Sequence, residues 1–263
     1  LDVTTPKQST RKQVYDFVVK ELTENIPLLS DIADKLTYGR FNRWAAKAIL
    51  AKVYLNAEVY TGTPEWAKCI QECDDIIAAA AGRYILEPDY KSPFRTENQN
   101  SKELIFTVPY DEIQATEFNM HMKGLDPVQQ FVFSMSAQPW GGSAAVPQFI
   151  DTYDPDDSRL KDTWIMGPQI NATTGAVAID YTKHLNGIAL SGSNQGYRLG
   201  KYEIKQGARS ALSVDFPIIR YADILMMKAE SLLRTGFENE AAVIVTEVRQ
   251  RAFRSNPAKA VVT

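Results

Sequence analysis

The stretch RWAAKAILAKVYLN, residues 43–56, decides the fold of this chain. Gly62, a residue typical of helix ends, lies a few positions beyond it. The stretch belongs to a segment from Arg40 to Tyr60 whose apolar residues recur at steps of three and four, the spacing of one helix face: Trp44, Ala48, Ala51, Leu55 and Val59. The segment therefore predicts a helix with small residues on its buried face, against which a second helix can pack closely.

A second helix is predicted directly after the first. Thr63 is a favoured N-cap residue, and Pro64 suits the first helical position. We interpret Cys69 and Cys73, the two cysteines of the chain, as small apolar residues of a buried helix. Apolar residues share one face of this helix until Gly82 stops it: Trp66, Ile70, Cys73, Ile77 and Ala80. The two helices together predict a hairpin.

A similar hairpin is predicted near the end of the chain. Its first helix follows Pro217 and is broken by Gly236, and its second helix ends before Pro257. The faces of the two helices are marked by Tyr221, Leu225, Ala229 and Leu232, and by Ala241, Ile244, Val248 and Ala252. The spacing Gly-x-x-x-x-Ala occurs at both bends, from Gly62 to Ala67 and from Gly236 to Ala241. This is the turn of a tetratricopeptide unit, in which small residues let two helices pack closely.

One more helix is predicted near the N-terminus, from about residue 11 to residue 26. Thr10 and Gln13 have the spacing of a capping box, and Pro27 marks the helix end. The expected buried stripe consists of Val14, Phe17, Val18, Leu22 and Ile26.

The region between the hairpins has a different character. It is rich in Asn, Gln, Gly, Pro and aromatic residues, and its predicted strands are short: 104–108, 177–179 and 197–199. Loops this long within a compact domain are usually functional. We therefore predict a mainly α-helical single domain over residues 1–263. Its helical scaffold comprises 10–82 and 216–254, and its loop-rich, ligand-binding insertion comprises 83–215.

Charge and hydropathy argue against two classes of function. The chain has 263 residues, a formal net charge of −3 and no basic run of five or more, so nucleic-acid binding is not expected. No apolar run reaches the roughly 18 residues that span a bilayer. The first residues, LDVTT, lack the basic and apolar regions of a signal peptide, and an initiator Met is missing. We interpret the chain as a processed or truncated piece.

Several segments resemble the SusD/RagB family. The most specific is residues 216–225, FPIIRYADIL, which runs on to Lys228, Ala229 and Glu230. Residues 43–56 are similar to a helix that recurs in this family, and residues 248–252, VRQRA, are similar to its closing segment. Other family features occur between them in the expected order: Tyr84, Leu86 and Tyr90, a strand at 103–106, Asp157-Ser158-Arg159, and Lys201-Tyr202, which resembles the strand before the family's helix.

The resemblance implies a function and a location. Members are surface-exposed outer-membrane lipoproteins of gut-type Bacteroidetes that bind glycans or other nutrients and cap a TonB-dependent transporter of the SusC type. They use tetratricopeptide-like helix pairs as a scaffold and are not enzymes. Because they usually carry a lipidated Cys at the mature N-terminus and a long C-terminal part, we expect this chain to be the middle of a protein roughly twice as long. Contact with the membrane is then expected through a lipid anchor that lies outside the chain.

Glycan binding requires rings that stack on sugar faces and polar groups that bond hydroxyls. Trp140 is the main candidate, because a proline and two glycines flank it as in an exposed loop. The alternative is that its ring lies beneath its own loop. Trp164 is a second candidate, with packing as its alternative. Tyr110, Asn119 and His121 are candidate hydroxyl partners, and the alternative for each is a solvated surface position.

No catalytic residue, metal ligand or cofactor is predicted. The two histidines, His121 and His184, have no partner at metal-ligand spacing. Four aspartates could form an irregular calcium site: Asp151, Asp154, Asp156 and Asp157. The Gly and Glu that an EF-hand loop requires are missing. The alternative is that Asp156 or Asp157 caps a helix, with Arg159 pairing nearby.

The sequence thus predicts a non-catalytic protein that binds an oligosaccharide or another nutrient and delivers it to a SusC-like TonB-dependent transporter. One alternative is a tetratricopeptide-type protein–protein interaction module, which would need tandem repeats lining one groove. Another is a glycan-cleaving enzyme, whose two carboxylates could come from anywhere in the sequence. Turnover separates the enzyme from the binding protein.

Overall fold

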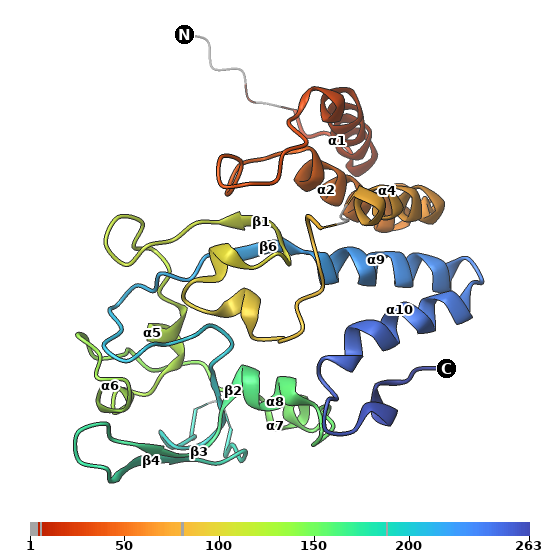
Figure 1. The fold of residues 1–263 in the computed structure, drawn as a ribbon. Helices are drawn as coiled ribbons and strands as arrows, with labels where there is room; N and C mark the ends of the chain where they lie inside the picture. Colours follow the sequence, from red (N-terminus) through yellow and green to blue (C-terminus); the bar gives the residue numbers. More distant parts are fainter. Residues whose placement is uncertain (1–4, 6, 80–81, 188) are drawn as a thin grey trace.

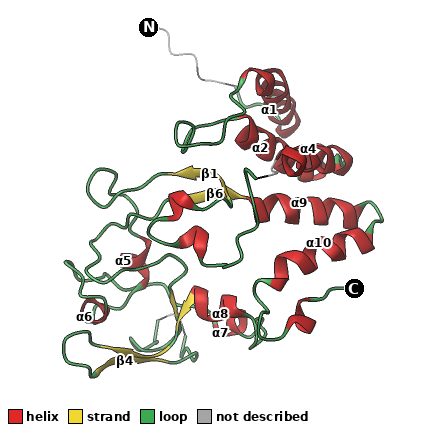
Figure 2. Ribbon diagram, viewed as in Figure 1, coloured by secondary structure: helices red, strands yellow, loops and turns green. Residues whose placement is uncertain are grey.

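The computed structural model describes residues 5, 7–79, 82–187 and 189–263. The fold is mainly α-helical, as predicted, with short strands between the helices (Figures 1 and 2). The longer helices are α1 (Arg11–Asn25), α2 (Arg43–Leu55), α4 (Trp66–Ala79), α9 (Tyr221–Arg234) and α10 (Glu238–Gln250). The short ones are α3 (Ala57–Thr61), α5 (Met120–Gly124), α6 (Gln129–Val132), α7 (Pro147–Ile150) and α8 (Ser158–Thr163).

The two predicted hairpins lie against each other. Helix α2 packs on α4, α4 packs on α9, and α9 packs on α10, so that hairpins far apart in the sequence form one continuous layer. Helix α1 adds to this layer at its α2 edge. In Figure 1 the layer runs from α1 at the top to α10 at the lower right, and the insertion occupies the left and lower part. The two hairpins, which are separated by the insertion in the sequence, are therefore neighbours in the folded chain.

Small residues make the close packing of this layer. The five alanines at 45, 46, 48, 51 and 57 have no exposed surface. On α4 the residues that face inward are Cys69, Cys73 and Ile76, also without exposed surface. The interpretation of both cysteines as buried apolar residues is confirmed, and both are free thiols.

The boundaries of the first hairpin differ from the prediction. The expected helix from Arg40 to Tyr60 is interrupted at Asn56, and Val59 on the following helix α3 is 65% exposed. Gly62 caps α3 in the left-handed region, at φ +81°, which confirms the predicted helix end. Helix α4 begins at Trp66 instead of Pro64. The expected face residue Ala80 lies outside the described residues.

Helix α1 has the predicted ends, but of the predicted stripe only Leu22 and Ile26 lie in the core. The capping box of Thr10 and Gln13 is formed, with Gln13 N–H donating to Thr10 Oγ1 at 3.2 Å and Thr10 N–H to Gln13 Oε1 at 2.8 Å. Val14 and Phe17 are 51% and 61% exposed. The residues of α1 that pack on the core are Tyr15, Val19 and Leu22.

Within the described residues, three two-stranded antiparallel sheets connect the layer to the insertion and shape the insertion itself. They pair β1 (Leu104–Val108) with β6 (Phe216–Arg220), β2 (Trp164–Ile165) with β5 (Arg198–Leu199), and β3 (Gly167–Ile170) with β4 (Val177–Tyr181). The strands expected at 104–108, 177–179 and 197–199 are confirmed. Two expectations were wrong. Lys201 and Tyr202 are not in a strand. The strand before α9 is instead β6, which pairs with β1 and includes positions after Pro217 that we had assigned to the helix.

The insertion has an interior made of aromatic rings. Tyr202 contacts Phe94 and Phe118 edge to face, at centroid distances of 5.6 and 4.9 Å, and stacks on Phe216 at 6.0 Å. Tyr110 joins the cluster through Phe118 at 5.3 Å. Most rings of the insertion therefore pack against each other, and only some of the rings in this aromatic-rich region face solvent.

Candidate functional site

Trp140 lies on a loop that is held tightly against helix α5. The Trp140 N–H donates to the carbonyl of Met122 at 2.8 Å, and Ser143 N–H donates to the carbonyl of Lys123 at 3.2 Å. Gly142 has φ +134°, and a Cβ there would meet the Lys123 carbonyl oxygen at 2.9 Å, so the loop passes α5 at a distance that admits glycine alone. The Trp140 side chain is 58% exposed, as its flanking residues predicted. The backbone is anchored while the indole faces solvent.

Arg198 ties this loop to the rest of the insertion. Its side chain is buried, and its guanidinium donates to the carbonyls of Ser143 at 3.4 Å and Ser193 at 2.8 Å. It also lies over the Tyr181 ring, 5.2 Å from the centroid. No carboxylate pairs with Arg198 among the described residues. The residue thus holds the Trp140 loop, the neighbouring loop and strand β4 together.

Helix α5 brings Asn119 and His121 close to the anchor of Trp140. Asn119 precedes the helix, is partly exposed and makes no capping hydrogen bond with its side chain. His121 is buried, with 4% exposed surface, and its Nε2 donates to the carbonyl of Arg209 at 2.8 Å. Burial lowers the pKa of His121, although the hydrogen bond to Arg209 acts in the opposite direction. His121 therefore lies beneath the surface that we expected it to line, because its ring packs inside the fold.

The other two predicted residues are half-buried against other rings. Trp164, on β2, is half-buried against Phe149, with ring centroids 6.1 Å apart, and its Nε1 donates to the Tyr153 hydroxyl at 3.4 Å. Tyr110 packs in the aromatic interior, and its N–H donates to an Asp215 carboxylate oxygen at 2.9 Å. The structure thus gathers Trp140, Asn119 and His121 around α5 but does not bring the five candidates to one point. Their part in ligand binding stays a prediction.

Two exposed rings of the insertion were not singled out from the sequence. Phe149, beside Trp164, is 52% exposed, and Phe131 is 55% exposed. Phe149 could have been found, since Pro147 places it on a short helix that presents one side to solvent. Nothing in the sequence around Phe131 distinguishes it from a core residue.

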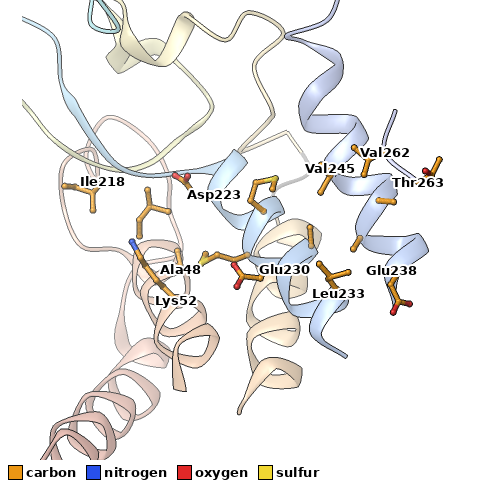
Figure 3. A pocket seen from close by; sticks show the side chains of 16 residues that line it. Ala48, Lys52, Ile218, Asp223, Glu230, Leu233, Glu238, Val245, Val262 and Thr263 are labelled. Atoms are coloured by element: carbon orange, nitrogen blue, oxygen red, sulfur yellow. The ribbon is translucent and has the colours of Figure 1, made fainter. Parts of the chain in front are cut away.

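A groove of about 640 Å³ runs along the helical layer between α2 and α10, with α9 between them (Figure 3). Its walls are mainly apolar, and Met226 and Leu233 in it are 40% and 56% exposed. Charged side chains also line it: Lys52, Asp223, Glu230 and Glu238. Such a surface suits a protein segment better than a hydroxyl-rich glycan, because it offers few hydrogen-bonding groups.

A second cavity, of about 600 Å³, is lined mostly by residues with polar or charged side chains. It lies where the loop before α2 meets the segment 99–102 and strand β1. Hydroxyl, amide and cationic side chains line it, among them Tyr38, Gln99 and Lys102. By its chemistry this cavity suits a small polar ligand.

The aspartates at 151–157 are engaged within the protein. Lys259 binds Asp154 and Asp156, both at 2.8 Å, and holds the pKa of both carboxyl groups below the usual range. Asp157 caps α8 and pairs with Arg159, as the alternative to a calcium site predicted. In the part of the chain that the structure describes, no three acidic, His or Cys side chains gather as they would around a metal ion. None of the described helices has the length and apolar character needed to cross a membrane.

Fold and surface together define a class: a helical-repeat protein whose layer of hairpins carries a loop-rich insertion with several solvent-exposed aromatic rings. Within this class, the SusD family model matches residues 79–260. The chain belongs to the SusD family. A further family model, described as starch-binding associating with outer membrane, matches residues 2–55.

Relatives and solved structures agree with this assignment. The chain is 22% identical over 298 residues to the starch-binding protein SusD of Bacteroides thetaiotaomicron, covering 94% of this chain and 52% of the relative. It is similar to a SusD superfamily protein from Parabacteroides distasonis, with a TM-score of 0.69 and 21% identity over 95% of this chain and 53% of that one.

A third similar structure is surface glycan-binding protein A from Bacteroides thetaiotaomicron in complex with laminarihexaose, with a TM-score of 0.69 and 18% identity. That match covers 92% of this chain and 54% of the other. At these identities the likeness shows the fold. The chain spans about half the length of the relatives that it matches.

Proposed function

We propose that this chain belongs to a cell-surface protein that binds a glycan without cleaving it, and that Trp140 is a stacking platform for the sugar. The observation that carries the proposal is the combination of an exposed indole with an anchored backbone at Trp140. A ring that is held in place before the ligand arrives loses little conformational freedom on binding. Membership of a family with a starch-binding relative and a relative in complex with laminarihexaose supports a glycan as the ligand.

The partner and the location form part of the same proposal. The whole protein would deliver its ligand to a SusC-like TonB-dependent transporter at the outer membrane, and a lipid anchor outside this chain would hold it at the cell surface. The family description of residues 2–55, which names the outer membrane, supports this location. Asn119, which precedes α5, would extend the glycan surface around Trp140.

The test is a panel of oligosaccharides, with laminarihexaose and maltohexaose as the first probes, titrated calorimetrically into wild type and Trp140→Ala. Loss of one aromatic anchor should weaken binding by about 1–3 kcal/mol. Phe17→Ala is a matched control, because Phe17 is a comparably exposed ring on the scaffold, at 61% against 58%. Equal affinity of wild type and Trp140→Ala would remove Trp140 from the site.

A second variant tests the anchoring. Gly142→Ala forces a Cβ toward the Lys123 carbonyl and should displace the loop. The variant keeps the Trp140 side chain, so it changes the position of the indole and not its chemistry. We expect it to weaken glycan binding by a smaller factor than Trp140→Ala. Unchanged binding in Gly142→Ala would show that a fixed loop is not needed.

Two alternatives are tested alongside. The apolar groove over α9 favours a protein–protein interaction module, which would bind a polypeptide and no member of the glycan panel. A glycan-cleaving enzyme would release reducing sugars from the same panel over hours, and a binding protein would not.

A further inference from the structure

The polar cavity beside strand β1 is separate from the surface around Trp140. Its walls come from the loop that precedes α2, from Arg83 and Tyr84 after α4, and from residues 99–102. The loop is folded tightly, since the carboxylate of Asp34 accepts the N–H groups of Leu36 at 2.8 Å and Thr37 at 3.3 Å. A cavity of about 600 Å³ falls in the range of small-molecule sites, roughly 300–1,000 Å³.

The charges on its walls are unbalanced. Three cationic side chains line the cavity, those of Lys35, Arg83 and Lys102, and none of them has an ion-pair partner among the described residues. Arg83 lies over the Trp44 ring, 4.9 Å from its centroid, and donates to the Ala79 carbonyl at 3.1 Å. Among the described residues that line the cavity, Asp34 has the single carboxylate, and its Oδ1 accepts both backbone N–H groups of its turn, so cationic side chains outnumber the carboxylate by two. The cavity therefore favours an anion.

Uncharged polar groups lie beside these cations. The Gln99 side chain is exposed and makes no hydrogen bond within the described residues. Thr107 Oγ1 is buried without a well-formed hydrogen bond, beside the Tyr38 hydroxyl, which donates to Asp215. A buried polar group in this state is stabilised when a partner reaches it. An amide and a hydroxyl at these positions can bond the hydroxyl groups of a ligand.

We propose that this cavity binds an acidic saccharide, one that carries a carboxylate on a sugar ring as a uronic acid does. Lys35 and Lys102 would hold the carboxylate through charge-assisted hydrogen bonds, and Gln99 and Thr107 would bond ring hydroxyls. The proposal does not depend on the Trp140 surface, because the described walls of the cavity include none of the residues 138–143 that form the Trp140 loop.

The experiment titrates digalacturonate into the full chain at low salt, by calorimetry and by NMR shifts. Its methyl ester is the neutral probe of the same shape, and acetate is the carboxylate without a sugar. Lys35→Ala with Lys102→Ala should weaken digalacturonate binding at least about tenfold, since it removes two charged donors. Lys20→Ala with Lys161→Ala is the control of equal charge, because both lysines are exposed and lie outside the cavity.

Thr107→Val is a second variant that keeps the fold. The Thr107 hydroxyl has no well-formed hydrogen bond to lose, so the substitution should leave stability unchanged while it lowers affinity severalfold. Trp140→Ala should leave digalacturonate binding unchanged, which separates this site from the proposed glycan surface. The proposal would be overturned if wild type bound the methyl ester or acetate as tightly as digalacturonate. It would also be overturned if the double lysine variant kept full affinity for digalacturonate, or if wild type did not bind digalacturonate.

Discussion

The scaffold and the insertion are held together by different chemistry. In the scaffold, alanine, cysteine and isoleucine side chains close the interfaces between α2, α4 and α9. In the insertion, a chain of aromatic rings shares the interior with polar groups that are equally buried, such as Asn98 and Gln129. The Asn98 amide donates to the carbonyls of Pro93 and Asp215, both at 2.8 Å. Close packing orders one region, and hydrogen bonds between residues far apart in the sequence order the other.

This difference explains where binding surfaces can form. A layer of helices buries its small residues against each other and presents a regular, largely apolar outer face, as in the groove over α9. The insertion uses its polar contacts to hold loops in extended shapes, so that side chains such as Trp140 stand out from a fixed backbone. The scaffold fixes the position of the insertion, and the insertion carries the proposed glycan surface around Trp140.

The largest effect is expected where the two regions meet, at Glu103. This carboxylate has no exposed surface and accepts hydrogen bonds from Arg220 at 3.0 Å and from Arg251 at 2.5 and 3.1 Å. Glu103→Ala leaves two guanidinium groups without their partner and should lower the free energy of unfolding by about 3–5 kcal/mol, measured by urea denaturation.

The control for Glu103 is Glu230→Ala. Glu230 also pairs with an arginine, Arg234 at 2.8 Å, but this pair is exposed and should contribute less than about 1 kcal/mol. Equal losses in the two variants would mean that the Glu103 network does not join the regions. A separate unfolding step for the insertion in Glu103→Ala would sharpen the comparison, because it would show that the network couples them.

A smaller effect of opposite sign is expected at Lys201, in the polar part of the insertion. Its ammonium lies 4.4 Å from the centroid of the Phe94 ring and has no ion-pair partner within the described residues. Burial, together with the positive charge of Arg220, lowers the pKa of Lys201 to about 8. Lys201→Met keeps the packed stem and should raise the free energy of unfolding at pH 7 by about 1–3 kcal/mol, at about 1.4 kcal/mol for each pKa unit.

The pH dependence checks the cause. Because the folded-state pKa of Lys201 lies below that of an unfolded lysine, the unfolded chain binds more protons between pH 8 and 10.5, and wild type gains stability as the pH rises through this range. The difference between wild type and Lys201→Met should therefore shrink from pH 7 to pH 9.5. A difference that does not change with pH would indicate a packing effect instead of a charge effect.

The sequence was sufficient for most of the scaffold because its signals are local. The capping box at Thr10 and the glycines at 62 and 236 act within a few residues of the helix ends that they define. The strand β6 was missed because its pairing partner, β1, lies more than a hundred residues away, and FPIIRYADIL alone is equally compatible with a helix. Local patterns reveal elements, whereas the partner of an element is set by tertiary contacts.

The candidate site was less predictable for the same reason. The glycines and proline around Trp140 indicated an exposed loop, and the ring is exposed. Nothing near Tyr110 indicates that an Asp215 carboxylate, 105 residues away, binds its backbone, or that Phe118 covers its ring. The polar cavity escaped prediction entirely, since its walls come from three separate segments of the chain.

The smallest effect is expected on helix α1, where the scaffold departs from its own pattern. The spacing of Val14, Phe17 and Leu22 predicts one buried stripe, yet Phe17 is 61% exposed and the inward face contains Tyr15 and Val19. The helix is rotated from the expected face because α2 and α3 contact it on the side of Tyr15, whose ring lies 6.3 Å from that of Tyr60. Phe17→Ser should therefore change the free energy of unfolding of this chain by no more than about 0.5 kcal/mol. Val19→Ser, on the packed face but outside the expected stripe, should cost more, and urea denaturation of both variants separates the two helix orientations. A loss above about 2 kcal/mol for Phe17→Ser would show that the periodic stripe is the buried face in solution.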